Sequence, residues 1–131
     1  MTRSRWLVCA GALTLLGTQL DAHHSMAEYL TTERVTIQGE VVGFDFHNPH
    51  SFIYVRVTGA DGTVAQYAVE WSASSQLASR GITATTVRRG DELIITGYPA
   101  QNRPERRLRL MELQRPSDGF VFKHRAGEVL G

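Results

Sequence analysis

The sequence predicts an all-β domain, because most of the chain alternates between apolar and polar residues as half-buried strands do. The alternating segments are 34–46, 51–57, 63–71, 88–100 and 106–113. A short segment with helical features separates the third of these from the fourth. Three strands, a helix and two strands, with a bent first strand, indicate a small five-stranded OB-like barrel with one short helix. Another small barrel or a sandwich is the alternative.

The first strand is expected to bend sharply. Its apolar alternation runs as far as Val41 and resumes at Val42 in the opposite phase, and Gly39 and Gly43 flank the shift. An extra residue in a strand swaps the two faces in this way and marks a bulge. We therefore expect one long strand that pairs with a different neighbour at each end.

The second and third strands are expected to form a hairpin. The sequence GADG at 59–62 lies between them, and Asp61 and Gly62 are residue types that tolerate positive φ. The inward positions of the strands would form the core. This core is expected to contain Val35, Ile37, Val55, Val69 and Ile95.

One helix and further strands follow the hairpin. Serines that can cap a helix open the segment 72–81, and Gly81 stands where a helix would stop. A turn and a strand occupy 88–100, and 106–113 is the next strand. The tail segment 119–124 could add an edge strand.

Residues 1–22 have the features of a secretory signal peptide: a basic start, an apolar run at 6–17 and a small residue, Ala22, before the cut. The apolar run is shorter than the ~20 residues that a membrane-spanning helix needs, although a retained N-terminal anchor is an alternative. We therefore expect a signal peptide, 1–22, and a single domain, 23–131. That domain would be periplasmic or secreted, without a stable membrane anchor after processing.

The composition excludes several kinds of site. The only cysteine, Cys9, would leave with the signal, so a metal in the domain would need nitrogen and oxygen ligands. The chain has 14 Lys and Arg residues and 13 Asp and Glu residues. Because two arginines and one aspartate lie in 1–22, the domain keeps 12 of each sign and a formal net charge of zero. Such a balance argues against a general polyanion binder.

Five arginines form the only basic cluster in the sequence. They are Arg103, Arg106, Arg107, Arg109 and Arg115. OB barrels bind single strands with basic residues and stacking aromatic rings, but no aromatic residue is interleaved here. We expect a solvated edge strand whose charges prevent further pairing, and no nucleic-acid partner.

The histidines are the candidate metal ligands. If the signal is cut after Ala22, His23 becomes the terminal residue and offers both its α-amine and its imidazole to one ion. The amine has an ordinary pKa of about 7.7–8.0, so a metal can displace its proton at neutral pH. With one more imidazole this set suits Cu(II). His24 is a weaker candidate, and His124 in the tail is expected to be exposed.

This arrangement resembles the histidine brace of copper-dependent polysaccharide monooxygenases and of some periplasmic copper carriers. The resemblance covers only His23 and a second histidine. A cut one residue earlier would leave Ala22-His23-His24, which places a histidine third. The amine, two backbone amides and that imidazole could then hold Cu(II) or Ni(II) without help from the fold.

The segment FHNPHS at 46–51 would supply the second histidine. Pro49 fixes one φ angle and pushes Asn48 toward an extended conformation, so the loop is stiff. His47 and His50 could both face the terminus, and the sequence does not distinguish them. Hydrogen bonds from their rings to the backbone are the alternative.

Two residues at the end of the third strand, Glu70 and Trp71, are expected to have different surroundings. Glu70 could orient a ligating imidazole, but an exposed carboxylate at the end of the strand is the simpler expectation. Trp71 is expected in the core.

Four motifs carry a resemblance over nearly the whole domain: AHHS at 22–25, NPH at 48–50, YAVEW at 67–71 and GDELIITGYPA at 90–100. Together they resemble a family of small exported bacterial proteins classed as a domain of unknown function. The resemblance implies an exported β-barrel and no established activity. The chain departs from the family where MAEY at 26–29 replaces a phenylalanine and a further alanine.

These features predict a periplasmic copper-binding protein that carries or buffers Cu(II). His23 would supply the amine and one imidazole, and His47 or His50 the remaining nitrogen. One alternative is a periplasmic interaction module that binds a partner protein or a glycan without a metal. A small oxidative copper enzyme is the other alternative, although a barrel of this size offers little surface for a substrate.

Overall fold

The computed structural model describes residues 26–125 and residue 128. Its elements are β1 (Val35–Asp45), β2 (Phe52–Thr58), β3 (Val64–Glu70), α2 (Ser74–Ala78), β4 (Glu92–Pro99), η1 (Arg103–Glu105), β5 (Arg107–Arg115) and β6 (Phe120–Lys123). Each strand expected from the alternation is present. The tail segment at 119–124 also forms a strand, β6.

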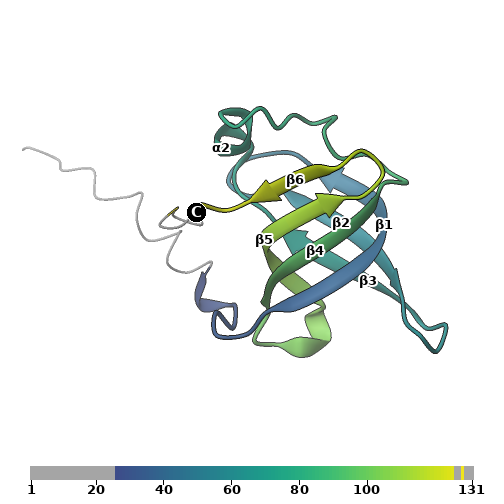
Figure 1. The fold of residues 1–131 in the computed structure, drawn as a ribbon. Coiled ribbons are helices and arrows are strands. Elements are labelled where there is room, and N and C mark those ends of the chain that lie inside the picture. The colour runs from purple at the N-terminus through teal and green to yellow at the C-terminus, as the bar shows by residue number, and fades with distance from the viewer. Residues whose placement is uncertain (1–25, 126–127, 129–131) are drawn as a thin grey trace, which may run out of the picture.

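The strands form one sheet in the order β3-β2-β1-β4-β5-β6, which closes into a barrel because β3 also pairs with β5 (Figure 1). The β3–β5 pair is parallel and the other pairs are antiparallel. β6 lies outside the closed five-stranded barrel and pairs with β5. The predicted all-β, OB-like barrel with one short helix is confirmed.

The first strand serves both halves of the barrel. The first half of β1 pairs with β4 and the second half with β2, and the register shifts between Val41 and Gly43. At the bend the backbones approach closely, because a Cβ on Gly39 would stand 2.2 Å from the carbonyl oxygen of Arg56. The phase shift in the sequence therefore marked a real bulge.

The core lies inside the barrel and contains the expected residues. Ile37, Val55, Val69 and Ile95 are buried, and Val35 is partly buried and packs against them. Alternation was a reliable guide here because one face of each strand points into the barrel.

The hairpin between β2 and β3 is present, but its turn differs from the expected one. Gly62 has a φ of +81°, whereas Asp61 does not have a positive φ. Asp61 instead accepts a hydrogen bond from the backbone N–H of Thr63, at 3.0 Å. The loop is longer than a two-residue turn, so positive φ at one position is enough.

The short helix forms where it was expected, and Gly81 follows it with a φ of +79°. The expected serine cap is wrong, because the N-cap residue is Ala73, which makes no side-chain hydrogen bond. Asn48 performs this task instead. Its Oδ1 accepts from the backbone N–H of Ser75 at 3.2 Å and from the hydroxyl of Ser74 at 3.1 Å. The start of α2 is thereby tied to the β1–β2 loop.

β5 is not the solvated edge strand that its arginines suggested. It pairs with β3, β4 and β6, and Arg109 is 0% exposed. Leu108 and Leu110 are buried on either side of it. The parallel pairing that closes the barrel sets Arg109 opposite Glu70, and this long-range contact gives the buried guanidinium an anionic partner.

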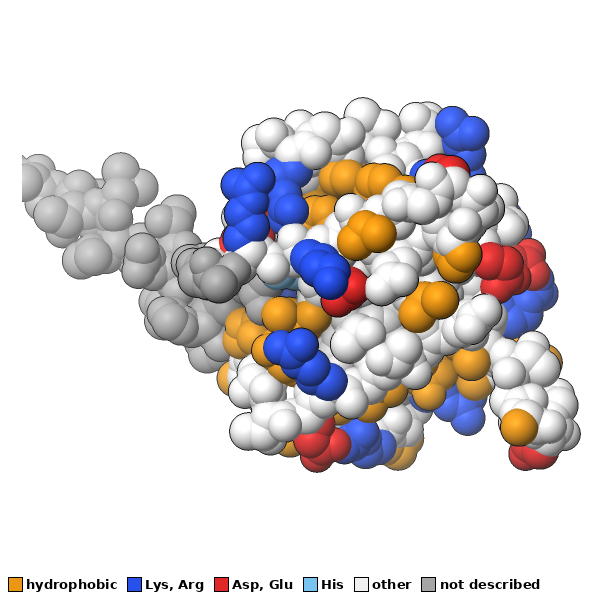
Figure 2. Space-filling view, in the orientation of Figure 1, with side chains coloured by type: hydrophobic (Ala, Val, Ile, Leu, Met, Phe, Trp, Pro, Cys, Tyr) orange, Lys and Arg blue, Asp and Glu red, His pale blue; other side chains and the backbone are white. Residues whose placement is uncertain are grey.

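The surface carries both signs of charge. On the face shown in Figure 2, basic side chains form separate groups among acidic and apolar ones. No helix in the described part of the chain is long and apolar enough to span a membrane.

Candidate functional site

The β1–β2 loop, which carries His47 and His50, is held in place through its backbone. The carbonyl of His47 accepts from the backbone N–H of Ser74 at 3.1 Å and from the hydroxyl of Ser51 at 3.3 Å. Ser51 in turn exchanges backbone hydrogen bonds with Ser72 and Trp71. The stiff loop expected from the sequence therefore has a physical basis, and it also contains a cis Asn48-Pro49 peptide bond.

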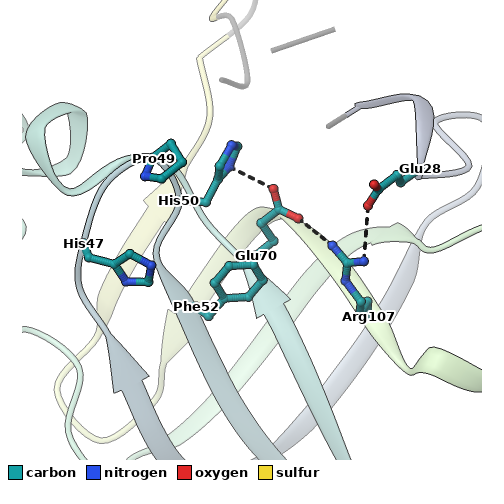
Figure 3. Close-up of a pocket in the computed structure, with 7 residues that line it drawn as sticks. All are labelled: Glu28, His47, Pro49, His50, Phe52, Glu70 and Arg107. Atoms are coloured by element: carbon teal, nitrogen blue, oxygen red, sulfur yellow. Dashed lines mark hydrogen bonds and ion pairs between the residues drawn. The ribbon is translucent and has the colours of Figure 1, made fainter. Parts of the chain in front are cut away.

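A pocket of about 270 Å³ opens beside this loop (Figure 3). Its lining residues are Glu28, His47, Pro49, His50, Phe52, Glu70 and Arg107. In Figure 3, His47 lies at one end of the pocket, and Glu28 and Arg107 lie at the other. The pocket thus joins the histidine loop to the N-terminal part of the described chain.

Glu70 is buried, with 3% of its surface exposed, so the expectation of an exposed strand-end carboxylate is wrong. Its Oε1 lies 2.8 Å from Nδ1 of His50, whose ring turns toward it in Figure 3. Nη1 of Arg109 lies 3.2 Å from the same Nδ1. An arginine only donates and an ionised carboxylate only accepts, so the contact with Glu70 is a hydrogen bond in the tautomer that carries the proton on Nδ1. In the neutral ring this tautomer leaves the lone pair on Nε2.

Three further side chains hold the same carboxylate. Nη1 of Arg109 donates to Oε1 at 2.9 Å, Nη2 of Arg107 donates to Oε2 at 3.2 Å, and the hydroxyl of Tyr29 donates to Oε2. Arg109 also donates to the carbonyl of Trp71 at 3.2 Å. Charge-assisted bonds of this kind fix the position of Glu70 and therefore of the His50 ring.

Burial and the carboxylate of Glu70 shift the pKa values of Tyr29 and Arg109. Burial raises the pKa of Tyr29 far above its ordinary value, and the adjacent Glu70 raises it further, so the phenol stays protonated and donates. Burial lowers the pKa of Arg109, although Glu70 opposes this shift. A guanidinium remains charged even so.

The N-terminal part of the described chain packs against this end of the barrel. Leu30 donates from its backbone to Pro99 at 2.8 Å, and Gln101 donates from its backbone to Glu28 at 2.9 Å. The carboxylate of Glu28 also lies 3.2 Å from Arg107. These contacts place Glu28 at the pocket, only a few residues after the expected mature terminus.

The predicted ligands have different outcomes. His50 is partly buried and bonded to Glu70, whereas His47 is exposed and its ring makes no hydrogen bond to any described residue. Both line the same pocket. His23 and His24 lie outside the described residues. Within residues 26–125 and 128, no group of three or more His, Cys, Asp or Glu side chains is arranged to hold a metal ion.

His124 is not the exposed tail residue that the sequence suggested. Its side chain is 2% exposed and packs edge-on against Phe122, with ring centroids 5.2 Å apart. Trp71 is fully buried, as expected, and packs edge-on against the same Phe122 at 4.8 Å. A histidine after a four-residue strand gives no periodic signal of burial, because the covering residues come from elsewhere in the chain.

The sequence also missed the residues that surround Glu70. Tyr29 precedes the first strand, and Arg107 and Arg109 looked like a solvated run of charge. Arg109, between two leucines, was the one available signal. A charged side chain flanked by core residues has to be paired when both faces of its strand are covered.

Comparisons with known proteins give a family. A model described as a family of unknown function (DUF6152) matches residues 12–108. No curated protein matches the chain. Among solved structures, the chain is similar to the mitochondrial single-stranded DNA binding protein Rim1 of S. cerevisiae. The TM-score is 0.47, with 15% identity over 71% of this chain and 96% of that chain. This likeness carries no information about ligands.

Proposed function

The chain belongs to DUF6152, a family of unknown function, and we propose that it is a periplasmic copper-binding protein that carries or buffers Cu(II). The observation behind the proposal is the 2.8 Å contact between Nδ1 of His50 and the buried carboxylate of Glu70. Metal-ligating histidines commonly donate their other ring nitrogen to a carboxylate, which sets the tautomer and the ring orientation. His50 has this arrangement, and its Nε2 would be the ligand.

The geometry supports His50 over His47 as the second histidine. The ring of His50 is oriented by a carboxylate that three other side chains hold in place. A preorganised ring loses little conformational freedom when it binds an ion. His47 is exposed and has no such support.

The position of the chain start supports the terminal ligand. Glu28 lines the pocket, Tyr29 donates to Glu70, and His23 precedes Met26 by three residues. Three residues span at most ~10 Å, so a terminus cut after Ala22 would begin close to this end of the barrel. His23 would then contribute its amine and imidazole, with His24 as the weaker candidate.

A second function has one observation in its favour. Phe52 and Tyr54 stack on the outer face of β2, with ring centroids 6.5 Å apart, and neither belongs to the core. Phe52 also lines the pocket. Partly exposed aromatic rings of this kind suit an interaction module that binds a glycan or a partner protein without metal.

The decisive experiment is a Cu(II) titration of the exported protein, after N-terminal sequencing has shown that it begins at His23. One equivalent should bind, with an electron spin resonance spectrum of nitrogen ligands in a planar field. His50→Ala should weaken binding about tenfold or more, as loss of an oriented ligand does. The matched variant His47→Ala should change it little.

The terminal ligand is tested separately. A long, histidine-free extension ahead of His23 moves the amine away and should weaken binding as His23→Ala does. A single added residue is unsuitable, because it creates a third-position histidine. If the extended protein and His50→Ala both bind copper like the parent, the proposal is wrong. Oxygen consumption that depends on a reductant would instead indicate an oxidative enzyme.

A further inference from the structure

The β3 strand has a free edge along its first half. It pairs with β5 only at residues 68–70, so among the described elements residues 64–67 pair with β2 alone. The backbone N–H of Ala68 points away from β2 and donates at 3.1 Å to the segment that leads into β5. Because backbone groups alternate sides along a strand, the N–H and C=O groups of Val64 and Gln66 face the same open side.

This edge lacks the features that commonly protect a free strand. Such protection comes from charged side chains, proline or a bulge, and residues 64–67 contain neither a charge nor a proline. Their register with β2 is continuous, so no bulge twists the edge away. Val64 is 61% exposed, more than any other large hydrophobic side chain of the described residues. The edge can therefore accept another strand.

The edge of β6 has the protection that β3 lacks. Val121 on β6 is also exposed, at 52%, but Lys123 at the end of the strand supplies a charge and pairs with Glu112 at 3.0 Å. Nη2 of Arg80 donates to the carbonyl of Lys123 at 2.9 Å, so part of the β6 backbone already has a partner. Val64 therefore lies on the less protected of the two edges.

The free edge of β3 is complementary to a second copy of itself. If two copies pair antiparallel about Ala65, Val64 of each copy lies opposite Gln66 of the other. Both residues direct their backbone groups outward, so each of these pairs exchanges two hydrogen bonds, which gives about four in all. Ala65 is small and would meet its own counterpart on the twofold axis, and twofold dimers are the commonest homo-oligomers.

Opposite charges flank this edge. Asp61 lies in the β2–β3 turn, which extends away from the barrel at the lower right of Figure 1, and its side chain is exposed. Arg106 borders the edge, because its carbonyl accepts from Ala68. The Arg106 side chain is exposed and makes no hydrogen bond or ion pair with a described residue. In the antiparallel register, the turn of each copy would lie beside Arg106 of the other.

We propose that the free edge of β3 binds a second copy of this chain, so that one sheet continues across two barrels. Backbone hydrogen bonds at Val64 and Gln66 form the centre of this interface, and Asp61 of each copy faces Arg106 of the other at its ends. The interface is small, so the dimer should dissociate with a constant on the order of 10⁻⁵ M. Glu70, the pocket residue on β3, is at the other end of the strand, and dimerisation requires no metal.

The first test is sedimentation equilibrium of the purified protein at concentrations on either side of this constant. A chelator is present so that no metal ion bridges two copies. The protein should follow a monomer–dimer equilibrium. The amides of Val64 and Gln66 should exchange more slowly as the protein concentration rises, whereas the amide of Val121 should not change. A chain that stays monomeric at the highest concentration would overturn the proposal.

Two variants locate the interface. Gln66→Pro removes an N–H that faces the open side, where a strand tolerates proline, and it should abolish the dimer. Val121→Lys places a charge on the edge of β6 and should leave the dimer unchanged. Circular dichroism checks that both variants fold. A folded Gln66→Pro protein that dimerises like the parent contradicts the proposed interface.

Charge reversal tests the register without depending on Gln66→Pro. Asp61→Lys brings two cations together at each end of the interface, and Arg106→Asp brings two anions together. Each variant alone should dimerise about tenfold more weakly than the parent. Arg106 has a φ of 49°, which aspartate tolerates. A heterodimer of the two variants has opposite charges at both ends, so mixing them should restore the affinity of the parent. A mixture that associates no more tightly than the separate variants would show that the two copies do not pair in this way.

Discussion

At the scale of single residues, Glu70 is the centre of the candidate site. One substitution can test the role of its negative charge without changing the size of its side chain. Glu70→Gln preserves the size of the side chain but removes the negative charge between Arg107 and Arg109. Because Arg109 is 0% exposed, breaking such a buried ion pair should cost about 3–5 kcal/mol in the free energy of unfolding. Urea denaturation followed by circular dichroism measures this change.

An exposed ion pair gives the matched control. Glu33 pairs with Arg103, and both side chains are 51% exposed. Glu33→Gln should therefore change the free energy of unfolding by less than about 1 kcal/mol. Equal effects of the two substitutions would contradict the view that Glu70 holds this end of the barrel together.

The sequence supplied the ligand types at the residue scale, but not their arrangement. His50 and His47 could not be distinguished, since the choice depends on Glu70, which lies 20 positions after His50 in the chain. Glu70 itself looked exposed, because neither Tyr29 nor Arg109 is near it in sequence. Buried polar contacts of this kind are set by tertiary packing, and the alternation of residues along one strand gives no information about that packing.

At the scale of elements, Asn48 couples α2 to the histidine loop. Asn48→Ala removes the oxygen that accepts from the backbone N–H of Ser75 and from two serine hydroxyls. Loss of a helix cap should cost about 1 kcal/mol and should speed amide exchange at Ser75, whose N–H loses its acceptor. Thermal unfolding and hydrogen exchange check the two effects.

A second asparagine offers the control for this prediction. Asn102 stands at the N-cap of η1 but makes no side-chain cap hydrogen bond. Asn102→Ala should therefore leave exchange at α2 unchanged and should cost less stability. If Asn48→Ala and Asn102→Ala behave alike, the helix does not depend on the loop.

The elements themselves were largely predictable, and the exceptions have a common cause. The strands and the bend in β1 followed from alternation and from glycine, which report local geometry. The helix cap and the position of β5 inside the closed barrel could not be predicted, because both depend on partners distant in sequence. These partners are Asn48 for α2 and β3 for β5. An edge strand and a closing strand have the same alternation until their neighbours are known.

At the scale of the whole molecule, acid should destabilise the fold in two stages. The folded pKa of His124 lies below its ordinary value of 6.5, chiefly through burial. The unfolded chain therefore binds more protons as the pH falls below about 6.5, and the free energy of unfolding decreases until the pH is below the folded pKa. Asp118 and Glu128 affect the stability at more acidic pH. A side-chain hydrogen bond from Arg115 holds the pKa of Asp118 below its ordinary value of 3.8. A hydrogen bond from the Arg125 backbone holds the pKa of Glu128 below its ordinary value of 4.5. Their contribution is lost only as the pH falls through those depressed values.

The two stages can be separated by urea unfolding at a series of pH values from 8 to 3. His124→Phe should remove much of the decrease between pH 7 and pH 5, since its ring takes up no proton, and should keep the decrease below pH 4. His47→Phe should retain both stages, because this substitution leaves the buried ring of His124 in place. A His124→Phe curve that runs parallel to the parent curve from pH 7 to pH 5 would show that burial of this ring does not contribute to acid sensitivity. The stability loss would then have to come from other groups, and the interior position of His124 would have no thermodynamic consequence in that range.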